Sequence, residues 1–376
     1  MPAQQVGIKV APAAPVASSK DSSDVRFHSD FAILAERGAL ADLTDRILRF
    51  PFFDKAEIMD AHDMLSYSSS LISVIMPVYN AAEFLEYSVI SACNQPEVGE
   101  VILIEDGSED SSLTICMRLQ QQNEKVKLYR HPDRGNHGSA SSRNLGVAKA
   151  SHDWISFLDA DDFYLHNRFA ITYKVLSENK DADGVYEAVG TVYENADCRK
   201  LWKENTQLAD LTTLSPGIQP EKLFYFWIGN RHGHVHLNGF TVRKKTLLEI
   251  GGFPKSLRLH QDTAMFIRLI NSYRLIPGSL REPVAQRRVH GKNRIAKPGF
   301  DFSLTRMMLW GDLLKWSIAE KIHPLRRLLV LNSFLHSRAN YYKKNGKPLN
   351  STFYKIPSLV LKKPCQIIID YHTSLT

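Results

Sequence analysis

Three stretches of the sequence decide the fold: LISVIMPVYN at residues 71–80, VILIEDGS at 101–108 and WISFLDADD at 154–162. Each begins with a continuous apolar run and ends in polar or acidic residues, as a buried parallel strand does where it enters a turn. Helical spacing occupies 81–95, 111–123 and 139–150, and a shorter strand is expected at 125–132. This alternation predicts an α/β fold, a Rossmann-like, mostly parallel sheet flanked by helices.

The composition is that of a globular protein. Of 376 residues, 44% are hydrophobic and 23% charged, which excludes a collagen, a coiled coil and a wholly disordered chain. The four cysteines lie far apart without a CxxC pair, so neither a zinc knuckle nor a disulfide framework is expected. The N-terminus lacks the pattern of a signal peptide, and no apolar run reaches 18 residues. We therefore expect a cytoplasmic protein that does not span a membrane.

The pattern along the chain predicts four parts. Residues 1–24 are expected to be a disordered leader, and 25–70 an N-terminal helical segment. Residues 71–300 are expected to form the main α/β domain, with a regular half at 71–182 and a less regular half at 183–300. The second half contains strand-like patterns at 184–194 and 234–244, an irregular polar stretch up to Pro220, and helical patterns at 244–250 and 262–275. Residues 301–376 are expected to be a basic helical extension, with helical character over 301–345.

Positive charge is concentrated in this extension. Residues 321–376 contain ten Lys and Arg against one Asp, a net charge of +9, whereas the first 320 residues carry 37 basic and 39 acidic residues. Two interpretations stay open: an anionic membrane surface, which would place the protein on the inner face of the plasma membrane, and a solvated helical face. A homodimer through the C-terminal helices fits the sequence, and no nucleic-acid recognition module is visible.

Polar side chains follow the expected strands. In open α/β sheets, ligands bind at the carboxyl ends of the strands. Here these ends contain 77–80, 105–108, 131–138 and 159–162, and the second and fourth segments are acidic. An acidic cleft repels a nucleotide diphosphate unless a divalent cation lies between them, so the carboxylates predict Mg²⁺ or Mn²⁺. Asp159 and Asp161 are expected to face the same side, and Asp162 the opposite one.

Four motifs occur in a characteristic order: SVIMPVYNA (73–81), VILIEDGSEDSS (101–112), GSASSRNLGVAKA (138–150) and WISFLDADD (154–162). In this order they resemble the family 2 glycosyltransferases with the GT-A fold. The resemblance weakens after residue 162 and returns at GGF (251–253) with Asp262 and at RVH (288–290). It implies a GT-A nucleotide-diphospho-sugar transferase fold with a helical C-terminal extension. Residues 71–300 would then be the catalytic domain, with 71–182 as its nucleotide half and 183–300 as its acceptor half.

The resemblance implies a site for a UDP-sugar. Asp106 would accept a hydrogen bond from the base, Arg143 would lie near the diphosphate with Asn144 supporting its loop, and Asp159 would bind ribose or metal-bound water. The amides at the start of helix 139–150 would also face phosphate. The implied nucleotide-binding residues are Pro77, Val78, Tyr79, Asn80, Glu105, Asp106, Gly107, Arg143, Asp159 and Ala160.

The resemblance also implies the catalytic and metal-binding residues. Asp262 matches the base that deprotonates the acceptor hydroxyl in inverting members, and Asp161 matches the ligand of the metal that bridges the diphosphate. His290 matches a position that ligates the metal or touches the diphosphate, and Arg288 or Arg294 would clamp phosphate. The family commonly has Glu-Asp where this chain has Gln261 and Asp262.

The acceptor is expected to contact Trp227, His234 and His236, because HGHVHLN (232–238) would place its histidines on one strand face. A zinc site there is an alternative, although no cysteine or carboxylate completes it. Structural roles compete with several assignments: an Asx turn for Asp106, an N-cap for Asp262 and a buried structural histidine for His290.

The sequence thus predicts an inverting, metal-dependent transferase that moves a hexose from a UDP-sugar to a hydroxyl of a glycan or lipid-linked acceptor, in cell-envelope or capsular polysaccharide synthesis. The alternative is a catalytically weak nucleotide-sugar-binding or scaffolding protein of the same fold. A dinucleotide-dependent oxidoreductase is disfavoured because no GxGxxG follows the first strand.

Overall fold

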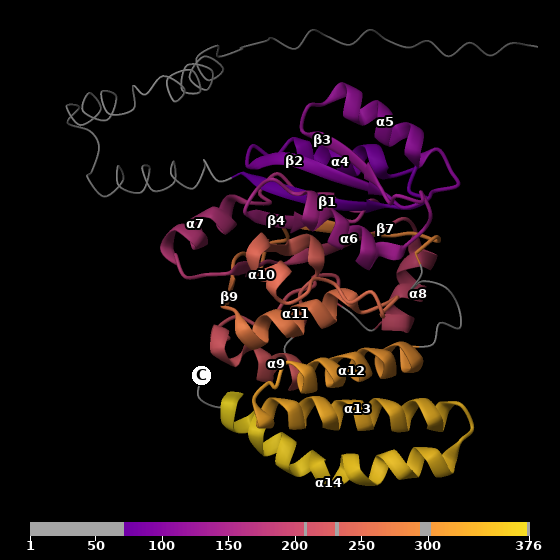
Figure 1. Cartoon of the computed structure of the whole chain (residues 1–376), viewed down its shortest axis with the longest axis vertical. Helices are drawn as coiled ribbons and strands as arrows, with labels where there is room; N and C mark the ends of the chain where they lie inside the picture. The colour runs from indigo at the N-terminus through magenta and orange to yellow at the C-terminus, as the bar shows by residue number, and fades with distance from the viewer. Residues whose placement is uncertain (1–70, 207–208, 230–232, 294–301, 374–376) are drawn as a thin grey trace, which may run out of the picture. The chain divides into compact units, whose positions relative to one another are not determined.

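The structure is a computed structural model that describes residues 71–206, 209–229, 233–293 and 302–373 (Figure 1). The expectations for the leader at 1–24 and the helical segment at 25–70 lie outside the described residues, as does the expectation for Arg294. The described residues belong to one compact unit.

A seven-stranded sheet lies at the centre of this unit, in the order β3-β2-β1-β4-β8-β6-β9. The first four strands in this order run parallel to one another: β3 (Val126–Arg130), β2 (Val98–Glu105), β1 (Ile72–Val78) and β4 (Trp154–Phe157). Strand β8 (Phe240–Arg243) is antiparallel to β4 and to β6 (Gly184–Tyr186), and β9 (Leu275–Pro277) is parallel to β6. The mostly parallel sheet is therefore confirmed, and both expected halves of the domain contribute strands to it.

Helices cover both faces of the sheet, which agrees with the apolar side chains on both sides of β1. Its side chains alternate between two hydrophobic cores, with Val74 in one and Ile75 in the other. Side chains of α4 (Leu85–Cys93), α5 (Ser112–Gln122) and α7 (Ala170–Glu178) complete the core that contains Val74. Side chains of α6 (Gly138–Lys149), α10 (Lys244–Glu249) and α11 (Gln261–Ser272) complete the core that contains Ile75. All six helices lie around the sheet in Figure 1.

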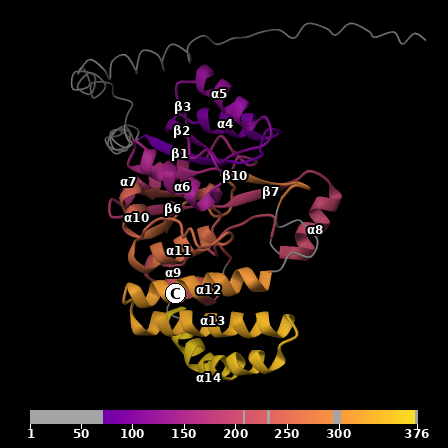
Figure 2. The same ribbon diagram turned by 45° about the vertical axis from the view of Figure 1, so that its right-hand side comes forward.

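A second sheet has the order β5-β10-β7, formed by β5 (Phe163–Tyr164), β10 (Ala285–Val289) and β7 (Val189–Tyr193). Strand β5 begins directly after the acidic loop 159–162, so its pairing with β10 brings the end of β10 to that loop. Helix α8 (Ala196–Thr206) packs against this sheet through Trp202 and Cys198 (Figure 2).

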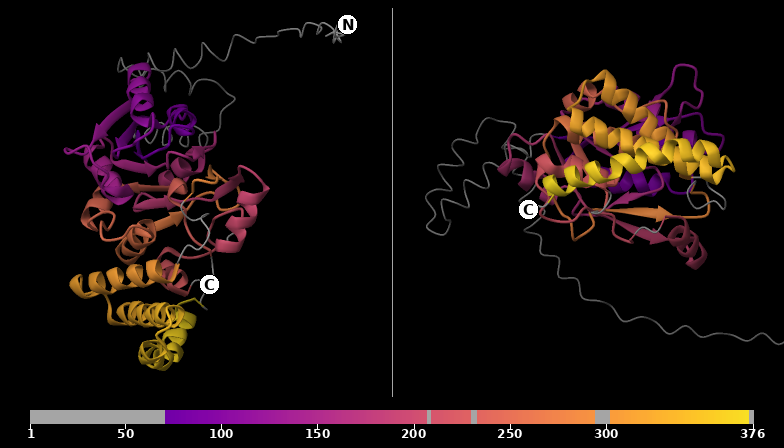
Figure 3. Two further views of the ribbon diagram at one scale, coloured as in Figure 1. Left: turned by 90° about the vertical axis from the view of Figure 1, so that its right-hand side faces the viewer. Right: turned by 90° about the horizontal axis from the view of Figure 1, so that it is seen from below.

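The C-terminal helices are stacked below α11 (Figure 3). They are α12 (Phe302–Ala319), α13 (Pro324–Lys344) and α14 (Pro348–Thr373), and α14 also packs on α9 (Leu223–Gly229). The helical character expected over 301–345 is confirmed in the described residues, where it is divided between two helices, α12 and α13. The chain turns at Lys321, whose φ is +50°, and restarts at Pro324, because proline fits the first helical position, where no N–H is needed.

Residues 195–244 also differ from the expectation. The polar stretch before Pro220 contains α8, and short 3₁₀ turns span Pro220–Lys222 and Leu237–Gly239. The expected strand over 234–244 is limited to 240–243, so the histidines do not share a strand face; His232 lies outside the described residues. Asn238 explains the difference. Its buried side-chain amide donates a hydrogen bond to the Asp162 carboxylate and accepts the backbone N–H of Asp159, and these contacts turn the chain away from an extended strand.

No helix in the described ranges combines the length and apolar character needed to cross a bilayer. The four cysteines, Cys93, Cys116, Cys198 and Cys365, are all buried thiols without a disulfide.

Candidate active site

Asp162 anchors the acidic loop that follows β4. Its carboxylate accepts the backbone N–H of Arg288 at 2.7 Å and the Nδ2–H of Asn238 at 2.6 Å. Burial, with repulsion from Asp161 and Asp159, raises the pKa of the Asp162 carboxyl well above its ordinary value. Asp162 thus faces the protein interior, while the side chains of Asp159 and Asp161 remain about one-third exposed, as the sequence predicts.

Asp161 and His290 meet although 129 residues separate them. The Nε2 atom of His290 lies 3.1 Å from Oδ2 of Asp161, and Asn293 Nδ2 lies 3.2 Å from the same oxygen. The His290 ring packs on Phe84, with ring centroids 4.6 Å apart. The fold therefore juxtaposes the carboxylate and the imidazole that were predicted to bind a metal.

The two atoms are at hydrogen-bond distance, and the same separation is compatible with two neighbouring ligands of one divalent ion. Neighbouring ligands of an octahedral ion with bonds of about 2.1 Å lie about 3 Å apart, close to the separation of Asp161 Oδ2 and His290 Nε2. In the described part of the chain, no three or more His, Cys, Asp or Glu residues are arranged to hold a metal ion. Mg²⁺ usually keeps several waters and binds one or two carboxylates plus substrate phosphates, so a two-residue site suits an ion that arrives with a diphosphate.

Arg143 links the acidic loop to helix α11. Its Nη2 donates to Asp159 Oδ1 at 2.6 Å, and its Nη1 lies 3.4 Å from Oε1 of Gln261. The same Gln261 oxygen accepts the hydroxyl of Ser139 at 2.9 Å, and the guanidinium lies over the ring of Phe253. This buried arginine lowers the pKa of the Asp159 carboxyl against the opposing effect of burial.

Asn144 holds the GGF turn against α6. Its amide exchanges two hydrogen bonds with the backbone of Phe253, each 2.8 Å long. Gly252 allows this approach, since its φ is +67° and a Cβ there would collide with the Asn144 side chain. Four motifs that are distant in the sequence therefore lie together in the fold: RN (143–144), DADD (159–162), GGF (251–253) and QD (261–262).

Asp106 is bound to the loop before α6. Its two oxygens accept the backbone N–H groups of His137 and Gly138, both at 2.8 Å. Glu105 is buried and pairs with Arg130 at 2.7 Å, which stabilises the preceding turn. Gly107 has φ +73°, and a Cβ there would meet the backbone of residues 134–136. Asp106, Glu105 and Gly107, which were predicted to bind the nucleotide, therefore fix the shape of this loop through contacts within the protein.

The end of β1 forms the next part of the site. Val78 is buried, whereas Tyr79 is 47% exposed and available to a ligand. Pro77 is the penultimate residue of β1, and Asn80 has φ +49° and accepts the N–H of Glu109. Ala160 is buried under α4, and its carbonyl accepts the hydroxyl of Ser88.

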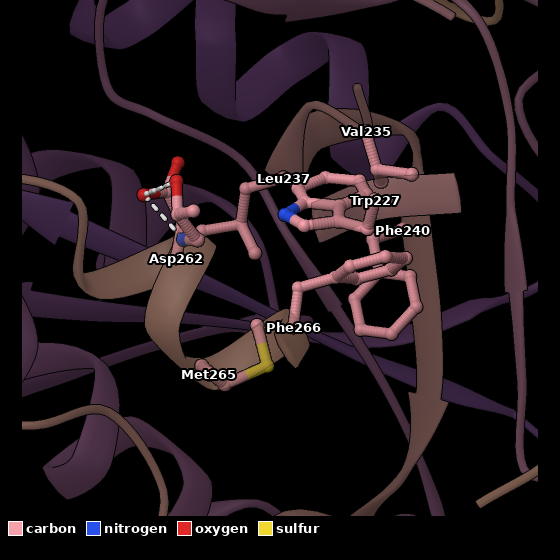
Figure 4. Close-up of a pocket in the computed structure, with 8 residues that line it drawn as sticks. Trp227, Val235, Leu237, Phe240, Asp262, Met265 and Phe266 are labelled. Carbon is pink, nitrogen blue, oxygen red and sulfur yellow. Dashed lines mark hydrogen bonds between the residues drawn. The ribbon is translucent and has the colours of Figure 1, made fainter. Parts of the chain in front are cut away.

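Asp262 lies at the edge of an apolar hollow opposite Trp227 (Figure 4). The residue that precedes helix α11 is His260, so Asp262 is not its N-cap. Within the described residues, the hydrogen bonds found for its carboxylate are to the N–H and hydroxyl of Thr263. The rest of the hollow is lined by Val235, Leu237, Phe240, Thr263, Met265 and Phe266.

Trp227 and the two histidines lie near this hollow. The Trp227 ring packs on Phe266 at 4.5 Å between ring centroids. Burial and the charge of Arg287 lower the pKa of His234, and they lower that of His236 to about 3. Asp262 acts electrostatically on both histidines, and Asp159 acts on His236. His236 therefore lies within reach of both carboxylates and is neutral at pH 7.

Sequence reasoning missed several contacts. The sequence marks Gln261 only as a departure from Glu, gives no role to Asn293, and predicts a strand for the segment that contains Asn238. The signal that could identify such residues is an Asn or Gln close in sequence to a catalytic motif, as Gln261 is to Asp262 and Asn293 is to His290. Arg288 was expected to clamp phosphate. In the structure its guanidinium lies over the rings of Phe84 and Phe163.

These features define a class of protein: a GT-A fold with paired carboxylates at the ends of parallel strands and a further carboxylate at the edge of an apolar hollow. Residues 73–246 match the family described as "Glycosyl transferase family 2", which agrees with the expectation for this region of the chain.

Similar proteins agree with this assignment. An uncharacterized glycosyltransferase of Haemophilus influenzae is 41% identical over 29% of this chain and 43% of its own length. The minor teichoic acid biosynthesis protein GgaA of Bacillus subtilis is 30% identical over 53% of this chain and 43% of its own length. The chain thus spans less than half of each relative. Residues 1–349 of S. aureus TarS, solved in complex with UDP-GlcNAc, align with a TM-score of 0.51 at 13% identity, covering 76% of this chain and 90% of that one. This structural likeness supports the GT-A fold.

Proposed function

We propose that this protein is an inverting, metal-dependent glycosyltransferase that moves a hexose from a UDP-sugar to a hydroxyl of a glycan or lipid-linked acceptor. One observation carries the proposal: Asp161 contacts His290 after β4, and Asp262 lies at the edge of an apolar hollow. The first pair suits a diphosphate with its cation, and the second arrangement suits a sugar hydroxyl.

In this proposal the residues divide the reaction between them. Asp262 accepts the proton of the acceptor hydroxyl as that oxygen attacks the anomeric carbon and UDP departs. Asp161 and His290 would hold Mg²⁺ or Mn²⁺, which supplies Lewis-acid neutralisation of the leaving diphosphate. Trp227, which lines the hollow, would offer a stacking surface to the acceptor sugar, and His236, next to the lining residues Val235 and Leu237 in the chain, would offer a neutral imidazole.

Two observations support UDP as the leaving nucleotide. The carboxylate of Asp106 has about four acceptor positions, of which two accept backbone N–H groups and a third faces His131 Nε2 at 3.4 Å. In this proposal the remaining position of this buried carboxylate accepts the N3–H of uracil when the nucleotide binds. TarS, which shares the fold, was crystallised with UDP-GlcNAc. The teichoic acid role named for the Bacillus subtilis relative supports a cell-envelope or capsular polymer as product.

Asp161→Ala tests the metal site. We expect UDP to bind at least about tenfold more weakly in Mn²⁺ than it binds to the unaltered protein, because one of two protein ligands is lost. Isothermal titration calorimetry with UDP, in Mn²⁺ and in EDTA, measures this, and Asp181→Ala, an exposed carboxylate, is the control. Equal affinity in Asp161→Ala and the unaltered protein would contradict the metal assignment.

A catalytically weak nucleotide-sugar-binding or scaffolding protein is the second candidate, because the chain has Gln261 where the family commonly has Glu. Tight UDP binding without any UDP release from UDP-sugars would identify it.

We also propose that α14 binds an anionic membrane surface. Along its outer side run Leu349, Phe353, Ile356, Val360, Ile367 and Tyr371, each more than half exposed, while Ser351, Ser358 and Cys365 on the opposite side are buried. This spacing places the apolar residues in one stripe. Lys355, Lys362 and Lys363 are exposed on the same helix, and this charge favours anionic lipid over an uncharged surface.

The stripe can be tested without disturbing the core. Replacing Phe353, Ile356 and Val360 together by serine should weaken binding to vesicles containing phosphatidylglycerol at least tenfold in a sedimentation assay, because their apolar area no longer enters the bilayer. A matched triple serine variant at Ile90, Met117 and Leu248, also exposed, should bind as the unaltered protein does. Deleting residues beyond 320 should abolish binding.

Unchanged vesicle binding in the α14 triple variant would overturn this proposal. So would a shift from dimer to monomer without any vesicle binding by the unaltered protein, since it would identify the stripe as a contact between two copies.

A further inference from the structure

Gln261 lies at the junction between the two halves of the site. It is the first residue of α11, directly before Asp262, and only 6% of its surface is exposed. Its Oε1 atom accepts the Ser139 hydroxyl and faces Nη1 of Arg143, both on α6. One amide oxygen thus ties the first turn of α11 to the helix that carries the nucleotide-side arginine.

The charges around this contact make the neutrality of Gln261 significant. Arg143 already pairs with Asp159 at 2.6 Å, so its charge is engaged on the nucleotide side. Asp262 acts electrostatically on His234 and His236 from the segment before β8 and on His260 before α11. The cations near these histidines are Arg287 on β10, which acts on the first two, and Arg306 on α12, which acts on His260. Burial lowers the pKa of all three, so these histidines are neutral at pH 7 and do not offset a further negative charge.

A carboxylate at position 261 would therefore have two effects. It would retain the contacts with Ser139 and Arg143, because both are donors. It would also place a second negative charge beside Asp262, which makes protonation of the base more favourable. The amide supplies the anchor without this electrostatic cost.

We propose that Gln261 is a positioning residue: it fixes Asp262 relative to the nucleotide half through Ser139 and Arg143, and its neutral side chain adds no negative charge beside the base. This inference rests on the proposed transferase function. It assigns to the departure from Glu a definite role in the reaction.

Two variants separate the anchor from the charge. Gln261→Ala removes the acceptor, so kcat for UDP release should fall about 10–100-fold at every pH, with UDP affinity unchanged within threefold. Gln261→Glu keeps the acceptor, so kcat at pH 8 should stay within about threefold, while activity is lost at higher pH than in the unaltered enzyme on acidification. Rates are measured from pH 4.5 to 8.5 with the UDP-sugar that the unaltered enzyme hydrolyses fastest.

Gln121→Glu, exposed on α5 on the far side of the sheet from α11, controls for added charge and should leave the pH profile unchanged (Figure 1). Thermal melting verifies that each variant is folded, and the Glu variant retains the contacts even if the Ala variant is unstable.

Three outcomes would overturn the inference: an Ala variant with unchanged kcat, an Ala variant whose loss is confined to UDP affinity, or a Glu variant with an unshifted pH profile. If the unaltered protein neither binds UDP nor hydrolyses any UDP-sugar, the proposed function itself fails, and this result is distinct from the other three.

Discussion

Asp262→Asn should lower the rate of UDP release about 10²–10⁴-fold, the range expected for loss of a general base. Asparagine has the same shape as aspartate, but its amide does not accept the proton of the attacking hydroxyl. UDP affinity should remain within about threefold, because Asp262 lies at the apolar hollow, whereas Asp159 and Asp161 bind Arg143 and His290. A coupled assay for free UDP, together with UDP calorimetry, measures both quantities.

Asp181→Asn is the matched control, because this exposed aspartate pairs only with the surface side chain of Arg274 among the salt bridges found. It should retain full activity. An Asp262→Asn variant with more than about a tenth of the normal rate would show that another group deprotonates the acceptor.

Arg168→Met should destabilise the fold by about 3–5 kcal/mol, because it leaves a buried carboxylate without its partner. Arg168 and Glu187 are both inaccessible to solvent, with Nη1 and Oε2 2.8 Å apart. The other guanidinium nitrogen donates to the hydroxyls of Ser156 on β4 and Thr241 on β8. The arginine therefore joins two neighbouring strands directly below the acidic loop 159–162. The midpoint of thermal unfolding should fall by about 5–8 °C.

The exposed pair of Arg274 and Asp181 again provides the comparison. It has a similar N–O distance of 2.8 Å, but Arg274→Met should cost less than about 1 kcal/mol because water replaces the lost interaction. Adding Glu187→Gln to Arg168→Met should recover part of the lost stability, since no buried charge then remains unpaired. Equal losses for Arg168→Met and Arg274→Met would contradict this view of the core.

The nucleotide half of the fold was readable from the sequence because its strands are continuous apolar runs. Such runs fit a strand buried on both faces, and β1, β2 and β4 are of this kind. The rule that ligands bind at the carboxyl ends of parallel strands then located the loop of Asp159 and Asp161. The pairing of Asp161 with His290 followed only from the family resemblance, since 129 residues separate them.

The acceptor half was less readable because tertiary contacts override its local patterns. The alternating segment around His234 and His236 resembles a strand, yet the buried amide of Asn238 bonds the Asp159–Asp162 loop and turns the chain. Similarly, spacing alone does not reveal that Gln261 reaches Ser139, 122 residues earlier. Long-range hydrogen bonds of single amides leave no periodic signal.

The central claim is that the acidic loop binds a metal-bound UDP-sugar and that the protein transfers its sugar. The most direct measurement is release of free UDP from a panel of UDP-sugars in Mn²⁺, Mg²⁺ or EDTA, because slow hydrolysis requires no known acceptor. We predict metal-dependent release from one sugar by the unaltered protein, and no release by Asp161→Ala. Absence of release from every UDP-sugar, together with absence of UDP binding by calorimetry, would contradict the claim.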